Sequence, residues 1–258
     1  MLSHIAVRVP QGMMLPMRKG IYQARLAAGA ADLARAQRLR QQVFRGGSAG
    51  GDADPFDAIC RHVLVEEVAT GTLVCCYRLL PLSAGSDIGQ SYAAQFYDVT
   101  ALGTFDAPMI EIGRFCSDPT RRDPDILRLA WAMLTRMVDD GGIGMLFGCS
   151  SFRGTDAAPY RDAFALLAHR HIAPKRWFPR VKAPAVVRFA EGLKARAPDL
   201  AAAMRAMPPL LRTYLAMGGW VSDHAVVDRD LNTLHVFTGL EITAIPPARA
   251  RLLRAVAG

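Results

Sequence analysis

Apolar and polar side chains alternate over residues 109–115, a pattern typical of a strand with one buried face. After a short polar loop, apolar residues recur at helical spacing from Pro124 onward, which predicts a helix with Asp123 as its N-cap. This pattern stops at a pair of glycines, residues 141–142, and residues 143–149 follow as an unbroken apolar run. Such a run is typical of a buried strand, so the pattern predicts a strand, a loop, a helix and a second strand in succession.

Glu111 and Arg114 do not fit a regular strand at this place. They are three positions apart, so their side chains would point to opposite faces and one of them would enter apolar packing. A β-bulge near Gly113 adds one residue and returns both polar groups to the same side. Backbone N–H groups left unpaired beside such a kink can polarise a carbonyl oxygen, and we expect Gly113 and Phe115 to supply them.

Three further strands and a helix are predicted before this unit. Residues 22–27 alternate weakly between apolar and polar side chains, and residues 62–68 and 73–80 form two strand patterns joined by a turn that contains glycine. Between the first and the second of these strands, apolar residues recur at helical spacing over residues 30–44, and arginines lie on the opposite face of the predicted helix. The pattern therefore mixes strands and helices, as in an α/β or α+β fold.

The chain is predicted to have three parts. Residues 1–18 are expected to form a flexible arm, residues 19–172 a folded core, and residues 173–258 an extension packed on that core. Within the extension, residues 174–207 combine arginines and lysines with bulky apolar side chains, and residues 226–237 predict a closing hairpin. Two interpretations of the basic part remain open: an amphipathic helix packed on the core, or a surface that faces a membrane.

Charge narrows the class of partner. The formal net charge is +8 and the pI is near 9.6, so an acidic partner or surface is expected. No stretch interleaves arginines with exposed aromatic residues, and no nucleic-acid-binding signature is present, so nucleic acid is not the expected partner. Hydrophobic residues make up 51% of the chain, enough for a full core, and the 21% of charged residues argues against an unfolded chain.

The cysteines and the lengths of the apolar runs indicate where in the cell the protein is expected. The chain has five cysteines and no C-x-x-C pair, which predicts reduced thiols and no zinc or other metal site. The apolar runs end well before about 18 residues, so no membrane-spanning helix is expected. The amino-terminal apolar patches are interrupted by Arg8 and Pro10, unlike those of a signal peptide. The expected location is the cytoplasm, with a peripheral place on the inner membrane left open.

The sequence Glu-Ile-Gly-Arg at residues 111–114, followed by a basic loop, resembles the core of the GNAT acyltransferase superfamily. More narrowly, it resembles the acyl-carrier-protein-dependent branch, which includes acyl-homoserine-lactone synthases and the haemolysin-like ornithine lipid N-acyltransferases. The resemblance implies a GNAT-like α/β (α+β) fold, a mixed and largely antiparallel twisted sheet flanked by helices, with a split between two central strands and a C-terminal extension. Further segments match in the order of the ornithine lipid branch, and they lie at residues 57–65, 77–80, 147–156 and 210–215.

The resemblance also implies an activity. A 3-hydroxyacyl group would pass from acyl carrier protein to the α-amino group of L-ornithine, giving lyso-ornithine lipid by direct attack of the amine on the thioester. No bound cofactor is expected, because the acyl-phosphopantetheine of the carrier protein is a co-substrate. Residue chemistry alone supports only thioester-dependent N-acylation. Two alternatives remain: an enzyme like the acyl-homoserine-lactone synthases, which the C-terminal extension disfavours, and a non-enzymatic peripheral membrane-binding protein.

Amide formation from a thioester requires a neutral amine, whereas a free α-ammonium group is largely protonated at neutral pH. Glu111 is the predicted base that removes the proton, directly or through water. Arg114 would orient Glu111 or bind the carboxylate of the amino acid in a bidentate pair. A covalent route through Cys116 or Cys149 is disfavoured, because both thiols lie in apolar strand runs where ionisation is costly.

The pocket for the amino acid follows from the resemblance. Its relatives use an arginine four residues before a phenylalanine, together with acidic residues of the next loop, and Arg40, Phe44, Asp54 and Asp57 occupy those places here. Carboxylates at these positions suit the side-chain ammonium of ornithine. Core packing would also explain Phe44, and a solvated acidic loop would also explain Asp54.

Arg78 lies amid apolar residues of a predicted strand, where a charged side chain needs a partner. Glu111 is the predicted partner. A buried structural pair and a role of Arg78 in substrate binding both remain open.

Arg121 and Arg122 come just before a predicted helix, and the N-terminus of a helix suits a phosphate group. Most GNAT enzymes place a glycine-rich turn here for the pyrophosphate of CoA, whereas residues 119–124 contain no glycine. This departure favours the single phosphate of phosphopantetheine, and the predicted carrier-binding set also includes Arg153. A solvated basic turn remains the alternative.

Overall fold

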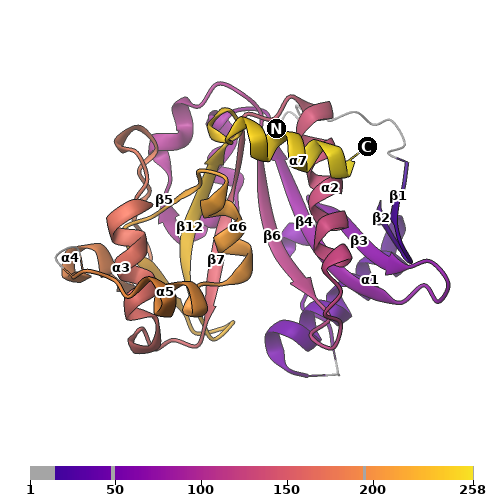
Figure 1. Ribbon diagram of the computed structural model, residues 1–258, viewed down its shortest axis with the longest axis horizontal. Coiled ribbons are helices and arrows are strands. Elements are labelled where there is room, and N and C mark those ends of the chain that lie inside the picture. The colour runs from indigo at the N-terminus through magenta and orange to yellow at the C-terminus, as the bar shows by residue number, and fades with distance from the viewer. Residues whose placement is uncertain (1–14, 48–49, 194–195, 258) are drawn as a thin grey trace. The chain divides into compact units, whose positions relative to one another are not determined.

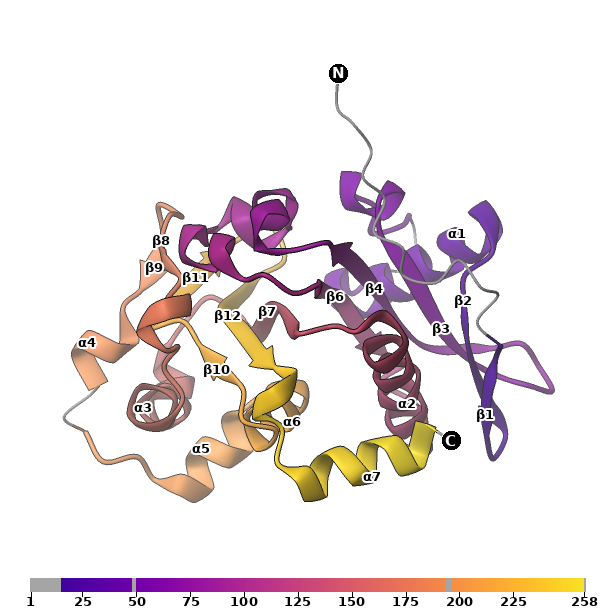
Figure 2. The ribbon, with the colours of Figure 1, turned by 90° about the horizontal axis from the view of Figure 1, so that it is seen from above.

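The computed structural model describes residues 15–47, 50–193 and 196–257 (Figures 1 and 2). The chain divides into two compact units. The first unit comprises Met1–Pro81, Ile110–Ile143 and Pro247–Gly258, and the second comprises Leu82–Met109 and Gly144–Pro246.

The first unit contains a sheet with the strand order β1-β2-β3-β4-β6. The first four strands pair antiparallel, each with the next, and Gly71 at φ 68° turns the chain between β3 and β4. All four strands predicted in this part of the sequence are confirmed. They correspond to β2 Tyr22–Leu26, β3 Arg61–Glu67, β4 Leu73–Leu82 and β6 Met109–Ser117, and the sheet also contains β1 Met17–Lys19, which the sequence pattern did not predict.

Helices cover both faces of this sheet. On one face, α1 (Gly29–Arg40) packs Leu39 against Leu64 of β3 and Cys76 of β4. On the other face, the hydroxyl of Tyr77 donates a hydrogen bond to the carbonyl of Ala130 in α2 (Pro124–Gly141) at 2.9 Å. Neighbouring residues of β4 therefore reach opposite helices, as the alternation of a strand requires.

The predicted ends of α2 are confirmed. Asp123 caps the helix through a hydrogen bond from the Asp125 N–H at 2.9 Å, Pro124 is its first residue, and Gly142 ends it in a left-handed conformation at φ 58°. The C-terminal helix α7 (Pro247–Ala257) lies beside α2 (Figures 1 and 2). An ion pair between Arg254 and Asp139, 2.9 Å long, links the two helices.

The second unit contains an antiparallel sheet with the strand order β7-β12-β11-β9, and β10 also pairs with β12. A separate pair joins β5 to β8. Strand β12 pairs with β7 along its whole length, from Thr233 opposite Arg153 to Glu241 opposite Met145. The bounds are β5 Tyr97–Asp98, β7 Met145–Arg153, β8 Arg180–Val181, β9 Val186–Val187, β10 Trp220–Val221, β11 Ala225–Asp228 and β12 Thr233–Glu241.

In the described part of the second unit, α-helices pack beside this sheet. Phe164 and Leu167 of one helix form a core with Phe152 of β7 and Leu234 of β12. The α-helices are α3 Arg161–Arg170, α4 Phe189–Leu193, α5 Leu200–Ala206 and α6 Pro209–Ala216. The shorter 3₁₀ helices of the unit span Gly85–Gln90, Ala93–Gln95, Thr100–Thr104, Ala158–Tyr160, Lys175–Trp177 and Ile242–Ala244.

The predicted fold class is confirmed: strands and helices are mixed, the pairings from β1 to β4 and those of β12 with β7, β10 and β11 are antiparallel, and helices flank the sheets. The split between two central strands stays a prediction, as do the boundaries of the core at 19–172 and of the extension at 173–258. Most of the predicted arm, residues 1–14, lies outside the described residues. Among residues 15–47, 50–193 and 196–257, no helix has both the length and the apolar character needed to cross a bilayer.

Candidate active site

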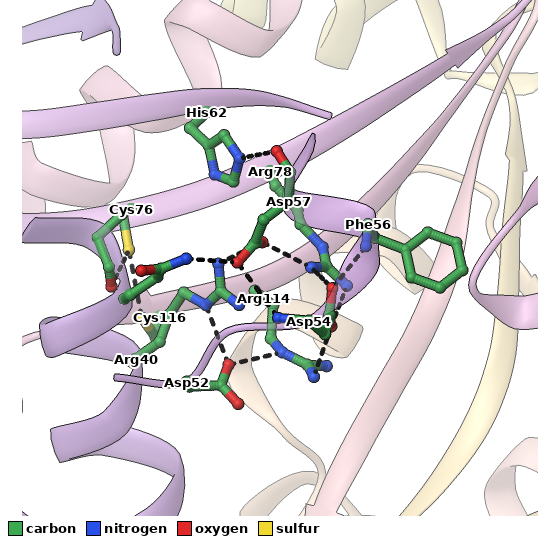
Figure 3. Close-up of polar contacts among 12 residues, drawn as sticks. Arg40, Asp52, Asp54, Phe56, Asp57, His62, Cys76, Arg78, Arg114 and Cys116 are labelled. Atoms are coloured by element: carbon green, nitrogen blue, oxygen red, sulfur yellow. Dashed lines mark hydrogen bonds and ion pairs between the residues drawn. The ribbon is translucent and has the colours of Figure 1, made fainter. Parts of the chain in front are cut away.

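Charged side chains from four segments of the first unit meet in one network, and Figure 3 draws its members other than Arg45. The segments are the end of α1 with the turn after it, the loop before β3, strand β4 and strand β6. Most of the side chains are buried, so the charges are paired with one another rather than with solvent. The network, called the arginine–aspartate cluster below, consists of Arg40, Arg45, Asp52, Asp54, Asp57, Arg78 and Arg114.

The loop before β3 presents its aspartates through local capping. A π-helical turn, Gln41–Arg45, extends α1, and Gly46 at φ 68° lets the chain leave it in a left-handed conformation. Asp54 then caps the 3₁₀ helix Pro55–Ala58 by accepting a hydrogen bond from the Phe56 N–H at 2.9 Å, and Asp57 accepts one from the Asp54 N–H at 3.4 Å. This capping box fixes both carboxylates on one turn.

Arg78 bridges these two carboxylates (Figure 3). Its Nη1 lies 2.5 Å from Asp54 Oδ1 and 2.8 Å from Asp57 Oδ1, and its Nη2 lies 2.9 Å from Asp54 Oδ2. Its guanidinium also stands over the ring of Phe56, 5.5 Å from the ring centroid. The partner that a charge in this apolar strand requires is therefore supplied by the aspartates. The predicted pairing of Arg78 with Glu111 stays a prediction.

Arg40 is almost completely enclosed, with 1% of its surface exposed. Its Nε donates to Asp52 at 3.0 Å and its Nη1 to Asp57 at 2.8 Å, while Gln37 donates to Asp57 at 2.9 Å. Burial raises the pKa of Asp57, but the hydrogen bonds from Arg40 and Gln37 outweigh it and lower the pKa to about 2. Asp57 is therefore ionised at neutral pH.

The β-bulge predicted near Gly113 stays a prediction, but the backbone of the next residue, Arg114, departs from that of a regular strand. Arg114 has a left-handed backbone at φ 53°, which costs a residue with a Cβ about 1–2 kcal/mol. Its Nε lies 2.8 Å from Asp52 and its Nη2 lies 3.0 Å from Asp54. A Cβ at residue 113 would lie 3.3 Å from Arg78 Nε, so glycine there leaves room for the Arg78 side chain.

Glu111 lies on β6 near the cluster and is only 4% exposed. Burial raises the pKa of Cys60 to about 12. The charge of Arg78 opposes this rise and that of Glu111 adds to it, so the side chains of Arg78 and Glu111 both lie within electrostatic range of the Cys60 thiol. Phe115, two residues beyond Gly113, stacks on Tyr77 with a ring-centroid distance of 5.0 Å. The roles of Glu111 as base, and of Gly113 and Phe115 as oxyanion donors, stay predictions.

The sequence and the fold agree with a known family. A family described as an acetyltransferase (GNAT) domain matches residues 38–132, a range that holds every member of the arginine–aspartate cluster. An L-ornithine N(alpha)-acyltransferase from Rhodobacter capsulatus is 34% identical over 239 residues, which cover 87% of this chain and 91% of the relative. The chain belongs to this acyltransferase family. A second L-ornithine N(alpha)-acyltransferase, from Brucella abortus, is 30% identical over 245 residues, or 88% of this chain and 87% of the relative.

Among solved structures, the chain is similar to FeeM, an N-acyl amino acid synthase from uncultured soil microbes. The TM-score is 0.50, the sequence identity is 10%, and the match covers 86% of this chain and 92% of that chain. At this identity the likeness establishes the fold alone, which is the GNAT-like fold expected for an acyltransferase.

Other predicted site residues of the acyltransferase lie outside the cluster. Phe44 packs, partly buried, against the core between α1 and the sheet, as the packing alternative expects. Arg121 Nη1 forms an ion pair of 2.9 Å with Glu67, and Arg122 is exposed in the same loop. Arg153 belongs to the second unit, where it ends β7 with an exposed side chain. The carrier-binding role of the three arginines stays a prediction.

The thiol of Cys116 is poorly suited to covalent catalysis. It is buried 3.6 Å from the sulfur of Cys76, and the contact with Cys76 together with burial raises the pKa of Cys116 well above its ordinary value. All five cysteines are free thiols, as predicted.

Two members of the cluster, Asp52 and Arg45, are missing from the sequence-based predictions. Asp52 accepts hydrogen bonds from three arginines and is 2% exposed. Its signal in the sequence is the spacing Asp52-x-Asp54-x-x-Asp57 within an otherwise small and flexible segment. Three acids at this spacing, close before a strand that carries a buried arginine, could have been recognised as one charged set.

Proposed function

We propose that the chain transfers a 3-hydroxyacyl group from acyl carrier protein to the α-amino group of L-ornithine, forming lyso-ornithine lipid. The chain belongs to a family whose curated relatives are named L-ornithine N(alpha)-acyltransferase. This membership supports both ornithine as the acceptor and acyl transfer as the reaction. The carrier protein as donor is supported by residues 119–124, which contain no glycine to wrap a CoA pyrophosphate. No cofactor is bound, since the acyl-phosphopantetheine enters as a co-substrate.

In the proposed reaction, Glu111 takes a proton from the α-ammonium group, directly or through one water, and the neutral amine attacks the thioester carbonyl. A C–N bond forms, the C–S bond breaks, and the pantetheine thiolate takes up the second proton that the nitrogen loses and leaves as the thiol, while Glu111 returns its proton to solvent. The backbone N–H groups of Gly113 and Phe115 stabilise the negative oxygen of the tetrahedral intermediate. The left-handed backbone of Arg114 between them supports this role, because a regular strand would engage both groups in its ladder.

On the acceptor side, Arg114 is proposed to receive the carboxylate of ornithine, and Asp54 its side-chain ammonium. Asp54 has the most exposed carboxylate of the three, with 18% of its side chain accessible against 5% for Asp57 and 1% for Asp52. Asp57 and Arg40 are enclosed and would shape the pocket from behind, and Arg78 would hold Asp54 in place.

On the donor side, Arg121 and Arg122 are proposed to meet the phosphopantetheine phosphate and acidic side chains of the carrier protein, with Arg153 as a further contact. Peripheral binding to the inner membrane is proposed for α5. This helix exposes Leu200 and Met204, one turn apart, beside the exposed Arg205. Such a surface would bring the enzyme to the bilayer that receives an amphiphilic product.

The deciding experiment incubates the purified protein with 3-hydroxyacyl carrier protein and one amino acid at a time, and follows free thiol and the acylated product by mass spectrometry. Ornithine-dependent thiol release that greatly exceeds the release with lysine or glutamine is the expected result. Release with acyl-CoA but not with the carrier protein would refute the donor. Lactone formation that requires S-adenosylmethionine would instead identify a homoserine-lactone synthase, and vesicle binding without any thiol release would identify a non-enzymatic membrane protein.

A further inference from the structure

Asp52 binds three of the arginines of the arginine–aspartate cluster, and Figure 3 draws its contacts with Arg40 and Arg114. Its Oδ2 accepts from Arg40 Nε at 3.0 Å and from Arg114 Nε at 2.8 Å, and its Oδ1 accepts from Arg45 Nε at 3.2 Å. One oxygen atom therefore connects the end of α1 to the kinked strand β6. Within the first unit this contact joins segments that are more than 60 residues apart in the sequence.

The backbone around Asp52 is also fixed, through contacts with Gln37 of α1. The Asp52 N–H donates to the carbonyl of Gln37 in α1 at 3.1 Å. A Cβ at Gly51 would lie 3.3 Å from the Gln37 Cβ, so glycine allows this close approach. The loop is therefore docked on α1, so the backbone of Asp52 has a fixed position from which its carboxylate reaches the arginines.

Asp52 also remains charged in its enclosed position. Burial raises the pKa of Asp52, but the positive charges of Arg114 and Arg40 outweigh it and keep the pKa below its ordinary value. A buried, ionised acceptor forms short, directional bonds with guanidinium groups. It holds the Nε edge of both guanidinium groups.

Arg114 needs such an anchor. Its left-handed backbone sends the side chain in a direction that a regular strand would not allow, and the guanidinium is held at Nε by Asp52 and at Nη2 by Asp54. Two carboxylates on two edges fix both the position and the plane of the guanidinium. Arg40 shares the same Asp52 oxygen, and its Nη2 is buried with no hydrogen-bond partner among the described residues. Asp52 is therefore the carboxylate that Arg40 and Arg114 share.

We propose that Asp52 is a positioning residue of the acyltransferase: it sets the guanidinium of Arg114 for the carboxylate of the amino acid acceptor without touching the substrate itself. The inference rests on the proposed function, because it assigns Arg114 to the acceptor. It goes beyond that function by naming the group that orients Arg114. If Asp52 were only structural, its substitution would lower stability without a selective loss of kcat/KM for the amino acid acceptor.

Asp52→Glu is the most informative variant. It keeps the negative charge and hence the ionic balance of the cluster, but moves the carboxylate by about one methylene length. A misplacement of this size is expected to lower kcat/KM for ornithine by at least about tenfold. The KM for the acyl donor and the melting temperature should stay near the wild-type values. Wild-type kinetics for ornithine in Asp52→Glu would overturn the proposal.

The matched control is Asp32, which lies at the start of α1 outside the cluster. It is also a buried carboxylate that binds two arginines, with Arg25 Nη2 at 2.9 Å and Arg35 Nη1 at 3.1 Å. Asp32→Asn and Asp52→Asn should both reduce stability, but only Asp52→Asn should reduce kcat/KM for ornithine. An equal loss of kcat/KM in both variants would reduce Asp52 to a structural role.

A double-mutant cycle tests whether Asp52 acts through Arg114. In an Arg114→Lys background, Asp52→Asn should cause little further loss of kcat/KM for ornithine, whereas additive losses would overturn the proposal. If the wild type shows no ornithine-dependent thiol release, the proposed function fails, and the placement of Arg114 is tested by a crystal structure of Asp52→Glu. An unmoved guanidinium and an unchanged left-handed backbone at residue 114 in that structure would refute the positioning role on its own.

Discussion

The guanidinium of Arg78 and the carboxylate of Asp54 form two roughly parallel hydrogen bonds, of 2.5 Å and 2.9 Å. This arrangement depends on the planar fork of arginine, because a lysine ammonium is a point charge without that geometry. Arg78→Lys should therefore keep the charge, lose the paired contact and lower the free energy of unfolding by about 1–3 kcal/mol. The measurement is chemical denaturation of both proteins at neutral pH.

The matched control for Arg78→Lys is Arg188→Lys. Arg188 is half exposed, and its ion pair with Glu191 is long at 3.4 Å. Exposed pairs of this kind contribute about 0–1 kcal/mol, so the control should unfold like the wild type. Equal destabilisation by the two substitutions would contradict the importance of the Arg78–Asp54 geometry.

Glu111→Gln should abolish turnover while the fold stays intact. Glutamine has nearly the same shape as glutamate but cannot accept the proton of the α-ammonium group, and general-base catalysis contributes about 10²–10⁴-fold to a rate. The measurement is thiol release under saturating donor, together with thermal unfolding. Glu66→Gln is the control, because Glu66 is also buried on the first sheet but binds Arg25 and Arg35, away from the cluster. Near-normal rates in Glu111→Gln would exclude Glu111 as the base.

Charge reversal of Arg121 and Arg122 to Glu should raise the apparent KM for the carrier protein. The effect should shrink as salt is added, because screening weakens the attraction between the basic loop and an acidic partner. Arg188→Glu, on the second unit, provides the control for a general change in net charge. The KM for ornithine should stay constant in all three variants. An unchanged carrier-protein KM would remove both arginines from the docking surface.

Local signals in the sequence determine the elements that could be predicted. Asp123, Pro124 and Gly142 mark the ends of α2 within a few residues of the helix itself, so its limits follow from the sequence. The conflict between Glu111 and Arg114 likewise predicts an irregularity near Gly113, and the left-handed backbone lies at the next residue, Arg114. The pairing of β12 with β7 could not be predicted, because it joins positions 80 to 96 residues apart and depends on the packing of the whole second unit.

The contacts of the arginine–aspartate cluster also could not be predicted from local signals in the sequence. An arginine in an apolar strand predicts that Arg78 has a partner, but the partner depends on where the loop before β3 lies. That loop has no periodic pattern, and capping at Asp54 and docking of Gly51 on Gln37 determine its path. The contacts of Asp52 with Arg40 and Arg114 do not follow from the sequence for the same reason, because they form only after the loop is in place.

Acid should weaken the protein through Asp57. The pKa of Asp57 in the folded protein is about 2, below the ordinary value of 3.8, so the folded state favours the ionised form. This contribution to stability is fully present above pH 4 and is lost as the pH falls through 2, and the difference corresponds to about 2 kcal/mol. Unfolding free energies measured between pH 5 and pH 2 should fall less steeply in Asp57→Asn than in the wild type. Parallel pH profiles would contradict the low pKa of Asp57.

The exposed pair on α5 should contribute to membrane binding. Leu200 is 48% exposed and Met204 is 45% exposed, and Arg205 beside them suits anionic headgroups. Insertion of both side chains into the headgroup region removes apolar surface from water, which contributes about 25 cal/mol per Å². Replacing both by Gln should therefore lower co-sedimentation with phosphatidylglycerol-containing vesicles by at least about tenfold and leave kcat for ornithine unchanged. Leu127→Gln, on the 41% exposed Leu127 of α2, is the control and should bind vesicles like the wild type. Equal vesicle binding by the wild type and the α5 double variant would exclude this helix as the membrane contact, and binding that ignores the anionic lipid would exclude the role of Arg205.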